Sequence, residues 1–116
     1  MDIHIKRIYE TPTDTDGIRV LIDRVWPRGI RKEDARLTEW IKEIAPSTTL
    51  RKWFGHQEER FQEFSKNYVQ ELKEQEALVE KLLGYAEKKR LTLLYGAKDE
   101  KHNQAVVLKN YLENYR

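Results

Sequence analysis

Two polar stretches of the sequence hold the side chains that could do chemistry. In DRVWPRG, the guanidinium groups of Arg24 and Arg28 each offer a planar fork of N–H donors, which suits a phosphate or a carboxylate. Further along, Asp99, His102 and Asn103 follow a short apolar run. An imidazole held in place by polar neighbours can accept a proton or donate a hydrogen bond to a developing oxyanion. We therefore predict an anion site held by Arg24 and Arg28, with His102 as general base or electrophile and with Asp99 and Asn103 orienting it.

Three more side chains are expected to line this site, namely His56, Trp53 and Tyr95. His56 directly follows Gly55, which is expected to end a helix, and Tyr95 is the last residue of the apolar run before the second polar stretch. Polar residues that follow a helix-ending glycine often have no further role, so a purely structural explanation of His56 stays open.

The two polar stretches have structural explanations as well. Arg24 could pair with a carboxylate and tie its loop down, while Trp26 fills the core. Asp99 or Asn103 could cap a helix and leave His102 as an exposed polar residue.

Composition excludes several classes of site. The chain contains no Cys, which removes disulfides, a thiolate nucleophile and cysteine-based zinc or iron–sulfur sites. Its three His show neither H-x-x-x-H nor H-E-x-x-H spacing, and no glycine-rich phosphate loop is present. We predict no metal and no cofactor.

Charge leaves two classes of function in competition. The 22 basic and 20 acidic residues give a net charge of only +2, which argues against strong binding to nucleic-acid backbones. The unusual polar residues follow strand ends, which favours a small anionic ligand, nucleotide-like or sugar-phosphate-like. Whether the protein is an enzyme stays open at this point, and hydrolysis or group transfer is the reaction type to test. The alternative is a non-enzymatic module. It would bind nucleic acid through a patch of Arg24, Arg28, Arg31 and Lys32, or a protein through exposed tryptophans.

The size of the chain predicts one domain over residues 1–116, since 39% of the residues are hydrophobic and 36% are charged. No run approaches the roughly 18 apolar residues that a membrane span needs, and the N-terminus lacks a signal-peptide core. We expect a soluble, cytoplasmic protein.

Three strands and four helices follow from hydrophobic periodicity. Alternating apolar residues predict strands at residues 3–8 and 18–22, and the continuous apolar run at residues 91–95 predicts a strand that is buried on both faces. Apolar residues at three- and four-residue spacing predict helices within residues 46–55, 57–72 and 76–89, and a last helix that has His102 in its first turn. Residues 37–44 (LTEWIKEI) fit a helix or a strand. We favour a short additional strand, which would be the third in chain order.

These elements predict a small three-layer-like α/β domain with a short, mostly parallel sheet of three to four strands flanked by helices. In open sheets of this kind, ligands bind outside the carboxyl ends of the strands. Both polar stretches follow strand ends and therefore fall at this edge.

Three segments carry a resemblance to a known family: RVLIDRVWPRG, IAPSTTLRKWFGH and LTLLYGAKDEKHNQAVVLKNYL. Together, in this order and over nearly the whole chain, they resemble the small single-domain branch of the uncharacterised DUF488 family. The resemblance implies a compact α/β fold. It also implies a departure, because other branches carry a Cys-His-Arg signature after the last strand, where this chain has Lys101, His102 and Asn103. Only the histidine is retained.

Overall fold

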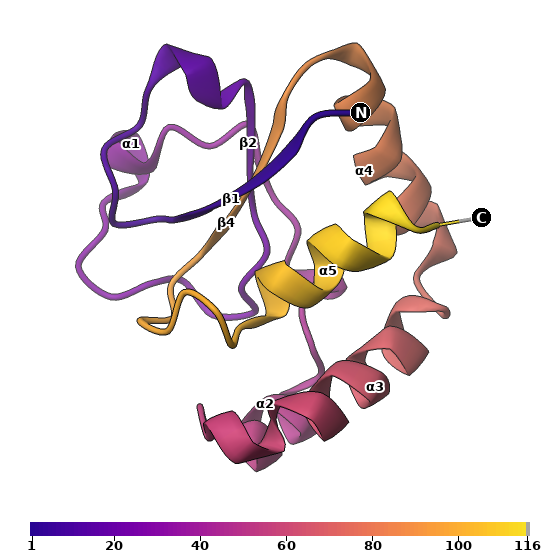
Figure 1. Cartoon of the computed structure of the whole chain (residues 1–116). Coiled ribbons are helices and arrows are strands. Elements are labelled where there is room, and N and C mark those ends of the chain that lie inside the picture. Colours follow the sequence, from indigo (N-terminus) through magenta and orange to yellow (C-terminus); the bar gives the residue numbers. More distant parts are fainter. Residues whose placement is uncertain (116) are drawn as a thin grey trace.

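The computed structural model describes residues 1–115. Four parallel strands form one sheet in the order β1-β4-β2-β3, and helices flank it (Figure 1). The strands are β1 (Ile3–Arg7), β2 (Ile18–Leu21), β3 (Glu39–Trp40) and β4 (Leu91–Tyr95). The α-helices are α1 (Lys32–Ala35), α2 (Thr48–Phe54), α3 (Phe61–Leu72), α4 (Glu76–Lys88) and α5 (Gln104–Glu113). The predicted small α/β fold is confirmed.

The central strand β4 pairs with β1 on one side and with β2 on the other. All five of its residues are buried, which explains why its sequence is a continuous apolar run and not an alternating one. β2 is also internal, between β4 and β3. The carboxyl ends of β2 and β4 therefore lie next to each other near the middle of the sheet.

The sheet separates two hydrophobic clusters. Leu93 of β4 belongs to the larger cluster, together with buried residues of α2, α3, α4 and α5. Its neighbour Leu94 points to the opposite face and packs with Leu21 and with Ala35 of α1. Helix α5 packs against β1 and β4, and these contacts fix where the loop before α5 lies. Figure 1 shows this loop running from β4 into α5.

Residues 37–44 contain both of the structures that the sequence left open. Only Glu39–Trp40 is a strand, and a 3₁₀ turn at Lys42–Ile44 follows it. Pairing with β2 ends with the hydrogen bond from the Ile41 N–H to the Leu21 carbonyl. The favoured third strand is thus present but limited to two residues, because the chain turns toward Pro46 and α2.

The helix boundaries show which local signals were reliable. Ser47 caps α2 by accepting the Leu50 N–H, and Gly55 ends the helix in the left-handed region at φ 52°. The helix predicted from residue 57 begins later, at Phe61, because Glu58–Arg60 forms a 3₁₀ turn. The four-residue helix α1 had no periodic signal in the sequence. Within residues 1–115, none of the helices combines the length and the apolar content that crossing a bilayer requires.

Candidate functional site

A pocket of about 790 Å³ opens at the carboxyl ends of β2 and β4. The loop after β2, the loop between β4 and α5, and helix α2 with the residues on either side of it form its walls. Its charged and imidazole side chains are Asp23, Arg24, Arg28, Arg51, His56, Lys98, Asp99 and His102. The arginine-bearing loop and the imidazole-bearing loop are therefore neighbouring walls of one pocket.

Arg24 donates hydrogen bonds to backbone carbonyls outside its own loop. Its Nε donates to the Pro46 carbonyl and its Nη2 to the Ala45 carbonyl, both at 3.0 Å. These bonds tie the loop after β2 to the segment that precedes α2, so that carbonyl oxygens take the place of the carboxylate considered from the sequence. Arg28, by contrast, is exposed at the pocket and has the freer guanidinium of the two.

The loop is also anchored by aromatic side chains. The Trp26 indole donates to the Ile30 carbonyl at 2.7 Å and packs edge-on against Trp40, with ring centroids 5.3 Å apart. Trp26 is half-buried against the smaller hydrophobic cluster. This packing gives Trp26 a structural role at the edge of the smaller cluster.

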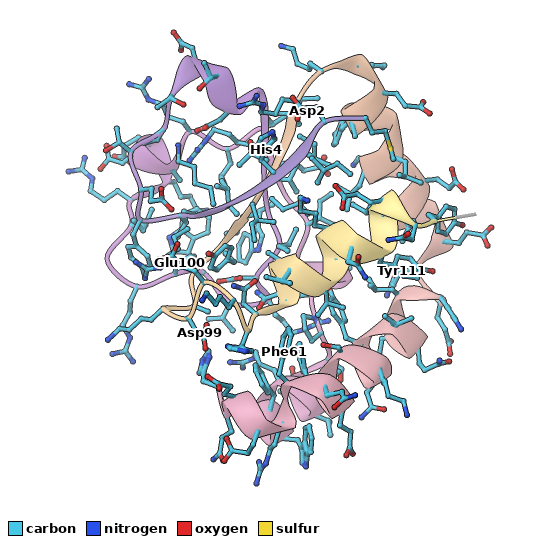
Figure 2. All side chains as sticks on the ribbon, in the orientation of Figure 1. Asp2, His4, Phe61, Asp99, Glu100 and Tyr111 are labelled. Carbon is cyan, nitrogen blue, oxygen red and sulfur yellow. The ribbon has the colours of Figure 1, made fainter. Side chains whose placement is uncertain are left out.

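Asp99 and His102 form a hydrogen-bonded pair. The Oδ2 atom of Asp99 lies 2.9 Å from Nδ1 of His102, while Oδ1 accepts the backbone N–H groups of Lys101 and His102. The Lys101 N–H, followed by the His102 side chain, holds the pKa of Asp99 below its usual range. The ring of Phe61 meets the imidazole edge-on, with centroids 5.1 Å apart. Figure 2 shows Asp99 on the loop that leads to α5 and Phe61 at the start of α3, where the two elements meet.

Asn103 is the cap of α5. Its Oδ1 accepts the Val106 N–H at 3.1 Å, its Nδ2 donates to the Asp99 carbonyl at 2.9 Å, and only 1% of the residue is exposed. Because α5 begins at Gln104, His102 lies just before the helix and not in its first turn as expected.

Two of the predicted lining residues lie elsewhere. Trp53 is on α2, 37% exposed, with the Arg60 guanidinium 5.2 Å from its ring centroid, and it does not line the pocket. Tyr95 is 2% exposed and packs in the larger cluster. His56 does line the pocket, and its backbone adopts the left-handed conformation at φ 58°, immediately after Gly55.

Asp23, Arg51 and Lys98 are the charged pocket residues that the sequence reasoning left out of the site. The Oδ2 atom of Asp23 accepts the Gly96 N–H at 2.9 Å and its Oδ1 accepts Nε2 of Gln104 at 2.5 Å. Burial raises the pKa of Asp23 to about 6, although these two hydrogen bonds and the charge of Arg51 oppose the rise. Its place directly after a buried strand was the available signal. Arg51 lacked one, because a basic residue on a helix surface is common.

The model of the family described as the inactive DUF488-N3 subclade matches residues 2–115. The chain belongs to this family. Over 114 residues it is 45% identical to the uncharacterized protein YeaO of Escherichia coli (strain K12), which spans 98% of this chain and 99% of that protein. Over 78 residues it is 50% identical to the uncharacterized protein Rv3073c of Mycobacterium tuberculosis (strain ATCC 25618 / H37Rv), across 67% of this chain and 66% of that protein. No solved structure matches the chain.

The predicted membership of DUF488, in its YeaO-like branch, is thereby confirmed. In this DUF488 chain, the positions that match the Cys-His-Arg signature hold an exposed Lys101, the half-buried His102 and the buried cap Asn103. The site thus offers an imidazole–carboxylate pair and several basic side chains, but no thiol.

One group of possible metal ligands lies beside the pocket of this DUF488 protein. Within residues 1–115, ligand atoms of Glu58, Asp99 and His102 lie within 4.8 Å of one another. Asp99 already accepts two backbone N–H groups and bonds to the imidazole, and Glu58 is exposed. Hydrogen bonding within the loop accounts for the approach of Asp99 to His102, and Glu58 comes from the 3₁₀ turn before α3.

Proposed function

We propose that this protein binds a small anionic molecule, of the sugar-phosphate or nucleotide type, in the pocket at the carboxyl ends of β2 and β4. Arg28 and Arg51 would contact the anion, with Lys98 and His56 beside them. Arg24 would hold the loop that presents Arg28. His102, held by Asp99, would accept or donate one hydrogen bond to the ligand.

The observation that carries this proposal is the concentration of positive charge around one pocket. Four basic side chains and two histidines line it, against two acidic side chains, in a chain whose total net charge is only +2. A concave site lined mainly by one sign of charge attracts ligands of the opposite sign. A volume of about 790 Å³ also falls in the range of ordinary small-molecule sites.

The family relationship favours binding of the ligand without turnover. The matching family is described as the inactive DUF488-N3 subclade. The position of the family's cysteine holds Lys101, and no other cysteine exists in the chain to replace it.

The second candidate is hydrolysis or group transfer at a sugar or a phosphate. The Asp99–His102 pair favours it, because a carboxylate that fixes an imidazole at Nδ1 leaves Nε2 for proton transfer. Turnover would appear as new ³¹P resonances when the protein is incubated with a bound sugar phosphate.

Binding to nucleic acid through Arg24, Arg28, Arg31 and Lys32 has less support. Arg24 is committed to backbone carbonyls, and Arg31 pairs with Glu33 at 2.9 Å. A protein-binding surface built on Trp26 and Trp53 is also less supported, because Trp26 is packed in the smaller cluster while Trp53 lies on α2.

Isothermal titration calorimetry with sulfate, inorganic phosphate, sugar phosphates, nucleotides and carboxylates would test the proposal. Arg28→Ala and Arg51→Ala should each weaken binding of the best ligand by about tenfold, the scale of one charge-assisted hydrogen bond. Arg31→Ala is the matched control, because it removes one exposed positive charge outside the pocket. Binding that is absent from the whole panel, or equally sensitive to all three substitutions, would contradict a site in this pocket.

A further inference from the structure

Two acidic residues line the pocket, Asp23 and Asp99. Asp99 orients His102, but Asp23 has no evident role in a pocket that only binds an anion. Asp23 follows the end of β2 and lines a pocket whose charge otherwise favours anions. Within residues 1–115 it forms no ion pair, and its two direct partners are the neutral N–H donors of Gly96 and Gln104. A mostly buried carboxylate without a basic partner is costly, so its presence in the pocket calls for an explanation.

The surroundings of Asp23 leave room to accept further hydrogen bonds. An ionised carboxylate has about four lone-pair positions, and the protein supplies two donors, one to each oxygen. The residue keeps a partly exposed surface and lines the pocket. Its unused acceptor capacity is therefore available to a molecule in the pocket.

The absence of a side chain at Gly96 lets the Asp23 carboxylate approach its backbone closely. A Cβ atom at this position would lie 2.9 Å from Oδ2 of Asp23 and 3.7 Å from Cβ of Pro27, so a larger residue would displace the acidic group. The close approach lets the Gly96 N–H hold the carboxylate in one orientation. A fixed, partly unsatisfied acceptor next to basic side chains is suited to a ligand that carries hydrogen-bond donors as well as negative charge.

We propose that Asp23 accepts hydrogen bonds from hydroxyl groups of the ligand, so that the pocket recognises a phosphorylated sugar, free or within a nucleotide, in preference to a simple anion. This inference rests on the proposed function, since the phosphate is held by the basic side chains of the same pocket. The phosphate contacts Arg28 and Arg51, and the sugar hydroxyls contact the Asp23 carboxylate. Asp23 is thus the specificity residue of the site.

Calorimetry with a matched set of ligands tests this assignment. The set consists of inorganic phosphate, ribose 5-phosphate and 2-deoxyribose 5-phosphate, at pH 8 where Asp23 is ionised. The wild-type protein should bind ribose 5-phosphate at least about tenfold more tightly than inorganic phosphate, since hydrogen bonds to a charged acceptor are worth this much. Asp23→Asn should remove most of this preference, and it should raise the affinity for inorganic phosphate because it removes a negative charge from the pocket. Asp34→Asn, an exposed substitution on α1, is the control and should change neither value.

A second measurement covers the case in which Asp23→Asn does not fold. In wild-type protein labelled with ¹³C, the side-chain carboxyl resonance of Asp23 should shift clearly more on addition of ribose 5-phosphate than on addition of inorganic phosphate. An equal preference in wild type and Asp23→Asn, or a carboxyl resonance that ribose 5-phosphate shifts no more than inorganic phosphate does, would overturn the role of Asp23. If inorganic phosphate binds through Arg28 and Arg51 without any preference for the sugar, only this inference fails. If no ligand binds at all, the proposed function fails with it.

Discussion

The carboxylate of Asp23 accepts the backbone N–H of Gly96 at 2.9 Å and so joins the ends of β2 and β4, 73 residues apart in the sequence. A second bond, from Gln104 at 2.5 Å, adds the first residue of α5 to the same group. One acidic side chain thereby connects three elements around the pocket, and its protonation state should affect both stability and binding.

Gly96→Ala should destabilise the fold by about 1–3 kcal/mol, the cost of displacing a buried carboxylate from its hydrogen bond. The added Cβ would lie 2.9 Å from Oδ2 of Asp23. Gly84→Ala is the matched control: it lies inside α4 with no atom within 4 Å of the new Cβ, and it should stabilise the protein by roughly 0.5–1 kcal/mol through helix propensity. Urea denaturation of both variants measures these changes. A Gly96→Ala protein as stable as wild type would show that the carboxylate is not held in this way.

Asp23 should make the protein more stable as the pH falls from 7 toward 4. Burial raises its folded-state pKa to about 6 from the ordinary value of 3.8, so between these values the folded protein binds more protons than the unfolded chain. Stability from this group is therefore largest below pH 3.8 and declines as the pH rises through 6, by at most roughly 3 kcal/mol.

The comparison with Asp23→Asn isolates this effect, since other titrating groups cancel in the difference. The free energy of unfolding of wild type, relative to the variant, should rise as the medium is acidified. The charged group that acts on Asp23 from α2 is Arg51, and Gly96 and Gln104 contact it from the loop after β4 and from α5. A difference that stays constant from pH 4 to 8 would contradict the raised pKa.

Arg24 and Arg28, although they share one short loop, should respond differently to removal. Arg24→Ala should lower the free energy of unfolding by about 1–3 kcal/mol, because the carbonyls of Ala45 and Pro46 lose their donors. Arg28→Ala removes an exposed side chain and should change stability by less than about 0.5 kcal/mol while it weakens anion binding. Chemical denaturation and calorimetry on both variants separate the two roles. The opposite ranking in stability would mean that Arg28 holds the loop.

The neutral imidazole of His102 should carry its proton on Nδ1. Asp99 is a strong acceptor 2.9 Å from that nitrogen, and its lowered pKa keeps it ionised at neutral pH. Two-bond ¹⁵N–¹H correlation spectra above pH 8 should show a protonated Nδ1 and an unprotonated Nε2. In Asp99→Ala the preference should shift toward the Nε2–H form. His4, which is exposed and bonds to Asp2 through Nε2, provides an internal reference of opposite geometry.

Residues close together in the chain encoded most of the fold. The apolar run at β4 predicted a strand buried on both faces because a central parallel strand is covered on each side. Ser47 and Gly55 marked the ends of α2 because capping depends on a few neighbouring backbone groups. β3 was less well predicted because pairing with β2 limits it to two residues. The start of α3 was predicted too early because a 3₁₀ turn at Glu58–Arg60 replaces the first expected turn of the helix.

The site shows the same division. The residue types and their places after strand ends were sufficient to bring Arg24, Arg28, Asp99 and His102 under consideration, since parallel strands end at one edge of the sheet. Which atoms they contact was decided only by the tertiary structure. The carbonyls that Arg24 binds lie 21 and 22 residues away, and the bond from Gln104 to Asp23 spans 81 residues. Periodicity and capping determine elements from neighbouring residues, whereas partners so far apart in the chain meet only when those elements pack together.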